Sequence, residues 1–211
     1  MTLEWVHPGL LLILGSWTLP FLPGRAKRLL MLLLPAMAVA ICLRMTPGIY
    51  GEVSFLGLDL VFGRADRLSL IFSYVFSIMA FLGMIYALHV KDDAQHVAAL
   101  TYAGAALGVT FAGDLISLVL FWELLAVSSV LLIWRRREPA AVAAGFRYLL
   151  VHVFGGLLLL AGIVLHWSQT GSIAFVQMEP FAGGGPGLEA GPVALPFGGG
   201  RGRLEQRPLG V

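Results

Sequence analysis

The stretch 115–134, LISLVLFWELLAVSSVLLIW, carries one ionisable residue, Glu123, near its middle. About 20 apolar residues are what an α-helix needs to cross a bilayer, and a carboxylate at the centre of such a helix costs roughly 2.5–3.5 kcal/mol on insertion scales. On a helical wheel, Glu123 shares its face with apolar residues such as Val119 and Val127. We favour a proton carrier, because ionisable groups inside membranes are commonly functional. The alternative is a protonated acid that bridges two helices.

Two more residues that suit proton transfer lie in the apolar stretch 143–167. His152 lies well inside it, and an imidazole can relay protons because its ordinary pKa is about 6.5. Gly155 and Gly156, on the same face, allow a neighbouring helix to come close. A proton relay and a simple interhelical hydrogen bond are equally open for His152. Arg147 lies nearer the start of the stretch, where its side chain either reaches the interface or pairs with a buried acid.

Four other residues are candidates for structural roles. Asp66 and Asp114 each come directly before an apolar stretch, the position at which a carboxylate caps the first free N–H groups of a helix. Gly104 and Gly108 are four residues apart, so they share one helix face and allow close contact with a second helix.

The composition is that of an integral membrane protein. Of the 211 residues, 58% are hydrophobic and 12% are charged, against about 25% charged in a typical soluble domain. The net charge of +2 gives no reason to expect a nucleic-acid partner. The single cysteine, Cys42, excludes an intrachain disulfide and a cysteine-rich metal site.

Soluble-type catalysis has no support in the sequence. It contains no glycine-rich phosphate loop, zinc-ligand cluster or plausible serine triad. The histidines His89, His96 and His166 lie at the ends of the predicted helices, whereas a b-type haem needs axial histidines at matching depth. We therefore predict no cofactor and no metal.

The apolar stretches predict an all-α, polytopic membrane protein with about six transmembrane helices and a short surface β-hairpin between helices two and three. The hairpin is expected within 46–67, turning near Leu56 and Gly57. A transmembrane domain is expected over 1–179 and a flexible Gly/Pro-rich tail over 180–211. The six helices are predicted at 6–22, 29–45, 68–90, 97–112, 115–134 and 143–167.

The basic residues predict the orientation in the membrane. With six spans, one side receives seven basic residues, and the positive-inside rule places that side in the cytoplasm. Both termini are then outside, in the periplasm if the cell is Gram-negative. The seven residues are Arg25, Lys27, Arg28, Lys91, Arg135, Arg136 and Arg137.

Three segments together resemble a known family: DRLSLIF at 66–72, GDLISLVLFWELLAVSSVLLIW at 113–134 and FRYLLVHVFGGLLLLAGIVLH at 146–166. They are similar to the antiporter-like membrane subunits shared by respiratory complex I and the multisubunit (Mrp-type) monovalent cation/proton antiporters, and the D-type component of the latter looks closest. The resemblance covers about residues 1–179 and implies a fourteen-helix protein in which inverted five-helix repeats each hold half of a proton path.

The same resemblance implies roles for single residues. Glu123 matches the essential glutamate of the fifth helix, which in relatives pairs with a lysine on the seventh. Arg147 matches a position that is often basic, and Asp66 matches the acidic residue that opens the third helix. This chain departs from the pattern because its two lysines, Lys27 and Lys91, fall in predicted loops. The change to a Gly/Pro/Arg composition after 179 predicts a truncated, frame-altered or split subunit.

The expected function is therefore transport rather than catalysis. We predict a membrane subunit of a multisubunit monovalent cation/proton antiporter that contributes part of a proton path around Glu123 in the inner membrane. Its partners would be other membrane subunits, protons, a monovalent cation and the lipid bilayer. The alternatives are a proton-translocating membrane subunit of a complex I-like NADH/quinone oxidoreductase and an assembly subunit without transport of its own.

Overall fold

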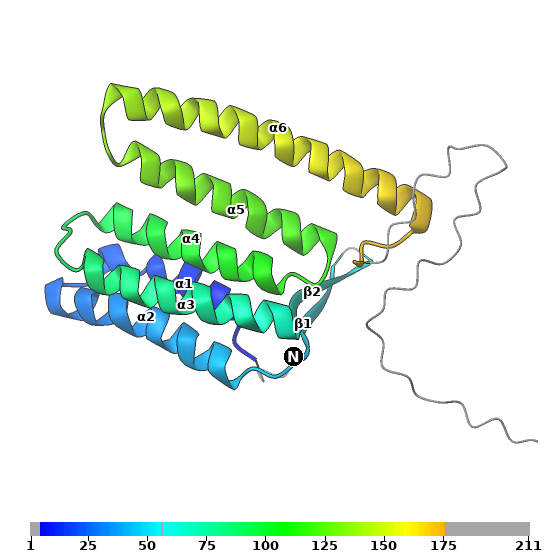
Figure 1. Cartoon of the computed structure of the whole chain (residues 1–211), viewed down its shortest axis with the longest axis horizontal. Helices are drawn as coiled ribbons and strands as arrows, with labels where there is room; N and C mark the ends of the chain where they lie inside the picture. The colour runs from blue at the N-terminus through cyan, green and yellow to red at the C-terminus, as the bar shows by residue number, and fades with distance from the viewer. Residues whose placement is uncertain (1–4, 56, 176–211) are drawn as a thin grey trace, which may run out of the picture. The chain divides into compact units, whose positions relative to one another are not determined.

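The computed structural model of the chain describes residues 5–55 and 57–175. The predicted tail, 180–211, lies outside these residues, and so do the last four positions of the predicted transmembrane domain. Within the described part, six α-helices and one β-hairpin follow one another along the chain (Figure 1). The elements are α1 (Pro8–Ser16), the 3₁₀ turn η1 (Leu19–Phe21), α2 (Gly24–Arg44), β1 (Gly48–Phe55), β2 (Leu58–Ala65), α3 (Arg67–Ala87), α4 (Asp93–Phe111), α5 (Leu115–Trp134) and α6 (Pro139–Thr170).

The helix α4 lies at the centre of the bundle. It packs against α1, α3 and α5, while α2 packs against α1 and α3, and α6 packs on α5 (Figure 1). The main buried core lies among α1 to α4, where Leu12, Leu100 and Phe111 are at most 1% exposed. Because α6 has one main helical neighbour among the described elements, much of its apolar surface is exposed.

The two strands form the predicted hairpin. β1 and β2 pair antiparallel from Gly48 opposite Ala65 to Phe55 opposite Leu58. Gly57, in the turn, has a φ of +78°, a conformation that glycine adopts without strain. The hairpin lies at one end of the bundle, which we call the hairpin end, and the α3–α4 and α5–α6 connections lie at the other, the basic end (Figure 1).

The bounds of the helices differ from the prediction at several ends. The helix α5 has the predicted bounds, but α2, α4 and α6 each begin four or five residues earlier. These extra turns contain polar residues and Pro139, which an apolar-run criterion leaves out although they are compatible with the first turn of a helix. The first helix is much shorter than predicted, because α1 ends at Ser16 and the chain continues through η1 around Pro20.

Four helices are long and apolar enough to cross a membrane: α2, α3, α5 and α6. The predicted count of six spans is not confirmed. At 1.5 Å per residue, the nine residues of α1 extend only about 14 Å. The helix α4 has 19 residues, but its first turn contains Asp93, Gln95 and His96, which make it less apolar than the four.

Candidate functional site

Glu123 lies where α5 meets α6. It is half-buried, and its carboxylate sits directly over Gly156 of α6, so that a methyl group placed on Gly156 would overlap Oε1. Among the described residues, no group forms a hydrogen bond or ion pair with this carboxylate. A glycine at this position of α6 therefore makes the space that the Glu123 side chain occupies.

His152 lies on α6 one helical turn before Gly156. Its ring stacks between Trp122 of α5 and Tyr148 of α6, with centroid distances of 5.7 Å to each and interplanar angles of 21° and 25°. The Nε2 atom of His152 is buried and has no hydrogen-bond partner in the described part of the chain. The site thus contains two titratable groups, Glu123 and His152, with free hydrogen-bonding atoms on facing helices.

Ser129 adds a polar contact that the sequence analysis did not find. Its Oγ lies 3.0 Å from the hydroxyl of Tyr148 and 2.7 Å from the carbonyl oxygen of Ala126. Because Tyr148 also stacks on His152, this hydrogen bond connects α5 to the aromatic side of the imidazole. This contact can be recognised only once the packing of α5 against α6 is known.

Two of the predicted site residues face away from this contact. Arg147 is exposed and forms no ion pair with any described residue. It lies nine residues before Gly156, about 13 Å along α6. Gly155 is also exposed, and a methyl group placed on it would meet no atom within 4 Å. The two neighbouring glycines therefore differ: Gly156 contacts Glu123, and Gly155 faces open space.

Asp114 joins three parts of the chain at the hairpin end. It is 1% exposed and caps α5, accepting hydrogen bonds from the backbone N–H groups of Ile116 and Ser117 at 2.9 and 2.8 Å. It also accepts from Ser117 Oγ at 2.6 Å and from the backbone N–H of Val61 in β2 at 2.7 Å. On the other side, Leu115 N–H donates to the carbonyl of Ile173, beyond α6. This carboxylate fixes the start of α5 to the hairpin.

His7 makes a second attachment at the same end, and the sequence analysis missed it. Its Nδ1 accepts from the N–H groups of Gly9 and Leu10 at 2.9 and 3.2 Å, so the ring proton is on Nε2, which donates to the carbonyl of Phe62 at 3.1 Å. The ring also stacks on Phe121 of α5 at 5.4 Å. His7 therefore connects α1, the hairpin and the segment of α5 that precedes Glu123.

Glycines hold α4 close to its neighbours. A methyl group on Gly104 would lie 2.5 Å from the carbonyl oxygen of Gly9 in α1, and one on Gly108 would overlap the ring of Phe121 in α5. Such close backbone approach favours helix association in membranes. Both α4 glycines lie against α1, because a methyl group on Gly9 would overlap the carbonyl oxygen of Gly104 and would be 3.0 Å from the backbone nitrogen of Gly108. Gly108 packs against α5 as well.

Asp66 caps α3 with a reciprocal pair of hydrogen bonds. Its Oδ1 accepts from the backbone N–H of Ser69, and Ser69 Oγ accepts from the backbone N–H of Asp66, both at 2.7 Å. The backbone hydrogen bond from Ser69 lowers the pKa of Asp66 below its ordinary value. All of these contacts are local, which distinguishes Asp66 from Asp114.

Ion pairs join the helices at the basic end. Lys27 of α2 pairs with Asp93 at 2.5 Å, and Arg135 donates from Nε to Oδ2 of Asp92 at 2.6 Å and from a second nitrogen to Oδ1. The hydrogen bonds from Arg135 lower the pKa of Asp92 below its ordinary value. The Lys27–Asp93 pair joins residues 66 positions apart in the sequence, and the Asp92–Arg135 pair joins residues 43 positions apart.

The Asp92 pair predicts a dependence of stability on pH. Because the pKa of Asp92 is lower in the folded state, its contribution is present above the ordinary pKa of aspartate and is lost as the pH falls through the folded value. At pH 6, we expect Asp92→Asn to lower the free energy of unfolding by about 1 kcal/mol, at the upper end for a partly exposed pair. Thermal unfolding in detergent from pH 6 down to pH 3 measures this.

The matched control is Glu138→Gln, which removes a carboxylate from the more exposed pair with Arg136. We expect its effect to be smaller than that of Asp92→Asn. A difference between Asp92→Asn and wild type that stays constant down to pH 3 would contradict the assignment.

The described residues contain no group of three or more His, Cys, Asp or Glu side chains placed to hold a metal ion.

Comparison with known proteins places this contact in a family. The sequence model of the family described as "NADH:quinone oxidoreductase/Mrp antiporter, TM" matches residues 112–192, which include Glu123 and His152. Na⁺/H⁺ antiporter subunit A1 from Staphylococcus aureus, strains bovine RF122 and Newman, is 37% identical over 120 residues, which are 54% of this chain and 15% of the relative. Over these matched residues the chain is similar to the antiporter-like family of membrane subunits.

Solved structures show the same fold for the antiporter-like chain. A chain of the membrane-bound sulfane sulfur reductase, an archaeal respiratory membrane complex, superposes with a TM-score of 0.71 at 19% identity, over 80% of this chain and 28% of that one. A chain of respiratory complex I from Thermus thermophilus superposes with a TM-score of 0.66 at 19% identity, over 87% and 40%. At this level of identity the likeness is one of fold.

The comparisons support the family and not the resemblance to the D-type component in particular, since the reported antiporter relatives are named subunit A1. The antiporter-like chain spans about one seventh of the length of these curated relatives. Over the matched residues it is similar to membrane subunits of the Mrp antiporter or complex I-like family.

Proposed function

We propose that the antiporter-like chain contributes part of a proton path in a multisubunit monovalent cation/proton antiporter, and that Glu123 takes up and releases the proton. The observation that carries this proposal is the carboxylate of Glu123, half-buried in a helix of membrane-spanning length and without a partner among the described residues. A carboxylate held in this way is free to exchange a proton, and ionisable groups inside membrane spans are commonly functional.

His152 is the proposed second carrier. It lies four residues from Gly156, so its position on α6 is about 6 Å along the helix axis from the residue that contacts Glu123. A proton leaving Glu123 would pass through water to the free Nε2 of His152, whose ring orientation is set by Trp122 and Tyr148. Arg147, exposed and farther along α6, would remain at the membrane interface as a topological anchor.

In this proposal α2, α3, α5 and α6 cross the inner membrane with α4 packed between them, and the basic end is in the cytoplasm with both termini outside. The other membrane subunits of the assembly supply what the described helices lack, including a basic partner for Glu123. Both lysines of this chain are near the basic end, and Lys27 already pairs with Asp93. The chain would thus provide one side of a proton site.

The test is exchange by the assembled complex in proteoliposomes under an imposed sodium gradient. We expect Glu123→Gln, which keeps the shape of the side chain but cannot carry a proton, to lower proton/cation exchange at least about 100-fold, the lower end of the range that positioned acid–base groups contribute. Glu138→Gln is the matched control, because Glu138 is an exposed carboxylate beyond α5. We expect that variant to exchange at the wild-type rate.

Three other results would contradict this proposal or favour an alternative. If Glu123→Gln leaves exchange unchanged, the proton role of Glu123 is wrong. If it instead prevents the chain from copurifying with its partners, the chain is an assembly subunit whose glutamate bridges helices. Flavin and iron–sulfur centres among the copurifying subunits would assign the chain to a redox-driven proton pump, to whose fold it is similar.

A further inference from the structure

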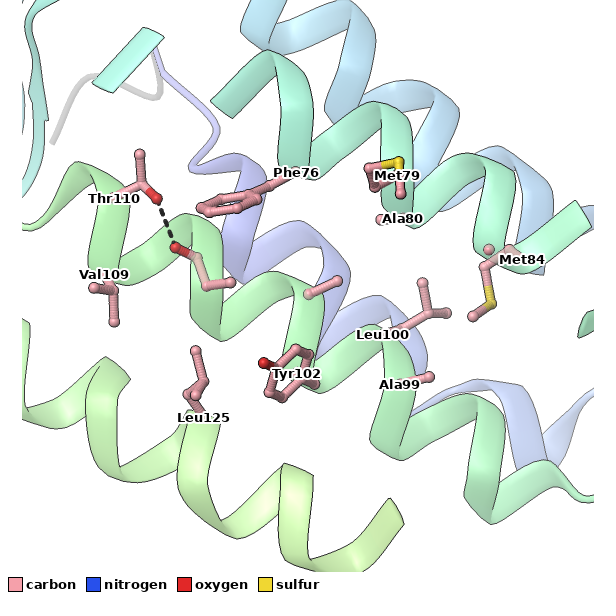
Figure 2. A pocket seen from close by; sticks show the side chains of 13 residues that line it. Phe76, Met79, Ala80, Met84, Ala99, Leu100, Tyr102, Val109, Thr110 and Leu125 are labelled. Atoms are coloured by element: carbon pink, nitrogen blue, oxygen red, sulfur yellow. Dashed lines mark hydrogen bonds between the residues drawn. The ribbon is translucent and has the colours of Figure 1, made fainter. Parts of the chain in front are cut away.

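An apolar hollow of about 460 Å³ lies along α4, between α3 and α5, and we call it the α4 groove (Figure 2). Its floor consists of small α4 residues, Ala99, Ala103 and Ala106, and Phe76 and Leu125 contribute to its two sides. Gly83 also lines the groove, and a methyl group placed there would meet no atom within 4 Å. The α4 groove lies where α5 meets α4, whereas Glu123 lies where α5 meets α6.

The length of the α4 groove fits one leaflet of a bilayer. Its lining on α4 runs from Ala99 to Thr110, and eleven residue steps of 1.5 Å extend about 16 Å. The hydrocarbon core of a bilayer is about 30 Å thick, so that one leaflet contributes about 15 Å. The groove begins at Ala99, about 9 Å inside α4 from the basic end. An acyl chain that enters from the basic end would therefore extend past the bilayer centre along the groove.

Positive charge gathers where such an acyl chain would begin. Lys91 is on the connection between α3 and α4, the two helices that line the groove, and the Asp92–Arg135 pair brings the end of α5 to this connection. Lys91 and Arg137 are exposed, and neither has an ion-pair partner in the described part of the chain. The segments 91–92 and 135–138 contain four basic and two acidic residues, a net charge of +2.

We propose that the α4 groove binds an acyl chain of an anionic bilayer phospholipid, whose phosphate contacts Lys91 and Arg137. The apolar lining excludes a charged occupant from the groove itself, and the excess of positive charge at its mouth favours a negative headgroup there. Each basic residue close to a membrane surface strengthens the binding of an anionic lipid roughly five-fold. This lipid site does not depend on any proton role of Glu123.

The test is native mass spectrometry of the full chain released from nanodiscs made of equal parts phosphatidylcholine and phosphatidylglycerol. We expect one phosphatidylglycerol to stay bound in preference to phosphatidylcholine. The double variant Lys91→Gln/Arg137→Gln should retain it about 25-fold less, at five-fold for each charge. The matched control, Arg25→Gln/Arg28→Gln, removes two exposed charges from the same end of the bundle, on α2, and should retain lipid as wild type does.

A second pair of variants tests the groove itself. Ala103→Phe fills the floor of the α4 groove and should release the lipid, whereas Ala161→Phe places the same side chain on the exposed surface of α6 and should not. Equal retention of the two lipids, or equal loss in both charge variants, would overturn the proposal. Photocrosslinking in native membranes from a photoreactive aromatic side chain in place of Phe76, which lines the groove, should label lipid. Labelling of a polypeptide alone would assign the groove to a neighbouring helix instead.

Discussion

Replacing Gly156 with leucine is expected to abolish the exchange of protons and cations by a complex that contains this chain. The carboxylate of Glu123 occupies the space over Gly156, so that even a methyl group there would overlap Oε1. The leucine side chain must therefore displace Glu123 or separate α6 from α5. A displacement of about 1 Å at a reacting group can lower a rate roughly 100-fold. Overpacking also lowers the free energy of unfolding by about 1–3 kcal/mol.

Gly155→Leu is the matched control for Gly156→Leu. The two variants add the same side chain at neighbouring positions of α6, but a substituent at Gly155 points to open space. We expect Gly155→Leu to exchange at close to the wild-type rate and to unfold at the same temperature. The measurements are exchange in proteoliposomes and thermal unfolding of the purified chain. Equal exchange by both variants would show that α6 does not pack against Glu123 at Gly156.

The sequence predicts the bounds of an element closely where the length of an apolar stretch determines the length of the helix. The bounds of α5 were predicted correctly, because Asp114 caps its start and three arginines follow its end. The hairpin turn at Gly57 was also predicted, since this glycine is placed between two alternating segments. The starts of α2, α4 and α6 were predicted too late, because a helix backbone continues into polar residues that an apolar window excludes.

The contacts between helices were less accessible to sequence reasoning. Periodicity places Glu123 and His152 on helix faces, but it does not say that Gly156, rather than Gly155, receives the carboxylate. His7 was missed because its role depends on Phe62 and Phe121, residues 55 and 114 positions away. Such contacts are set by how the hairpin and the helices pack, and a single sequence contains no direct measure of that packing.

Removing the carboxylate of Asp114 is expected to cause the largest loss of stability in the chain. Four donors converge on it, and one of them, the N–H of Val61, comes from the hairpin. Asp114→Ala leaves buried donors without acceptors, each costing about 1–3 kcal/mol, in addition to the loss of a helix cap. We expect the free energy of unfolding to fall by about 3–5 kcal/mol, a large part of the roughly 5–15 kcal/mol typical of a folded domain.

Asp66→Ala separates the capping role from the attachment to the hairpin. Asp66 caps α3 as Asp114 caps α5, but its partners are local, in the first turn of α3. We expect this variant to lose only about 1 kcal/mol. Asp114→Asn should fall between the two, because one amide oxygen still accepts from the first turn of α5 while the amide nitrogen opposes the N–H of Val61. Thermal unfolding in detergent ranks the three variants, and an Asp114→Ala variant no less stable than Asp66→Ala would mean that the hairpin is held to α5 mainly by His7 and the apolar contacts.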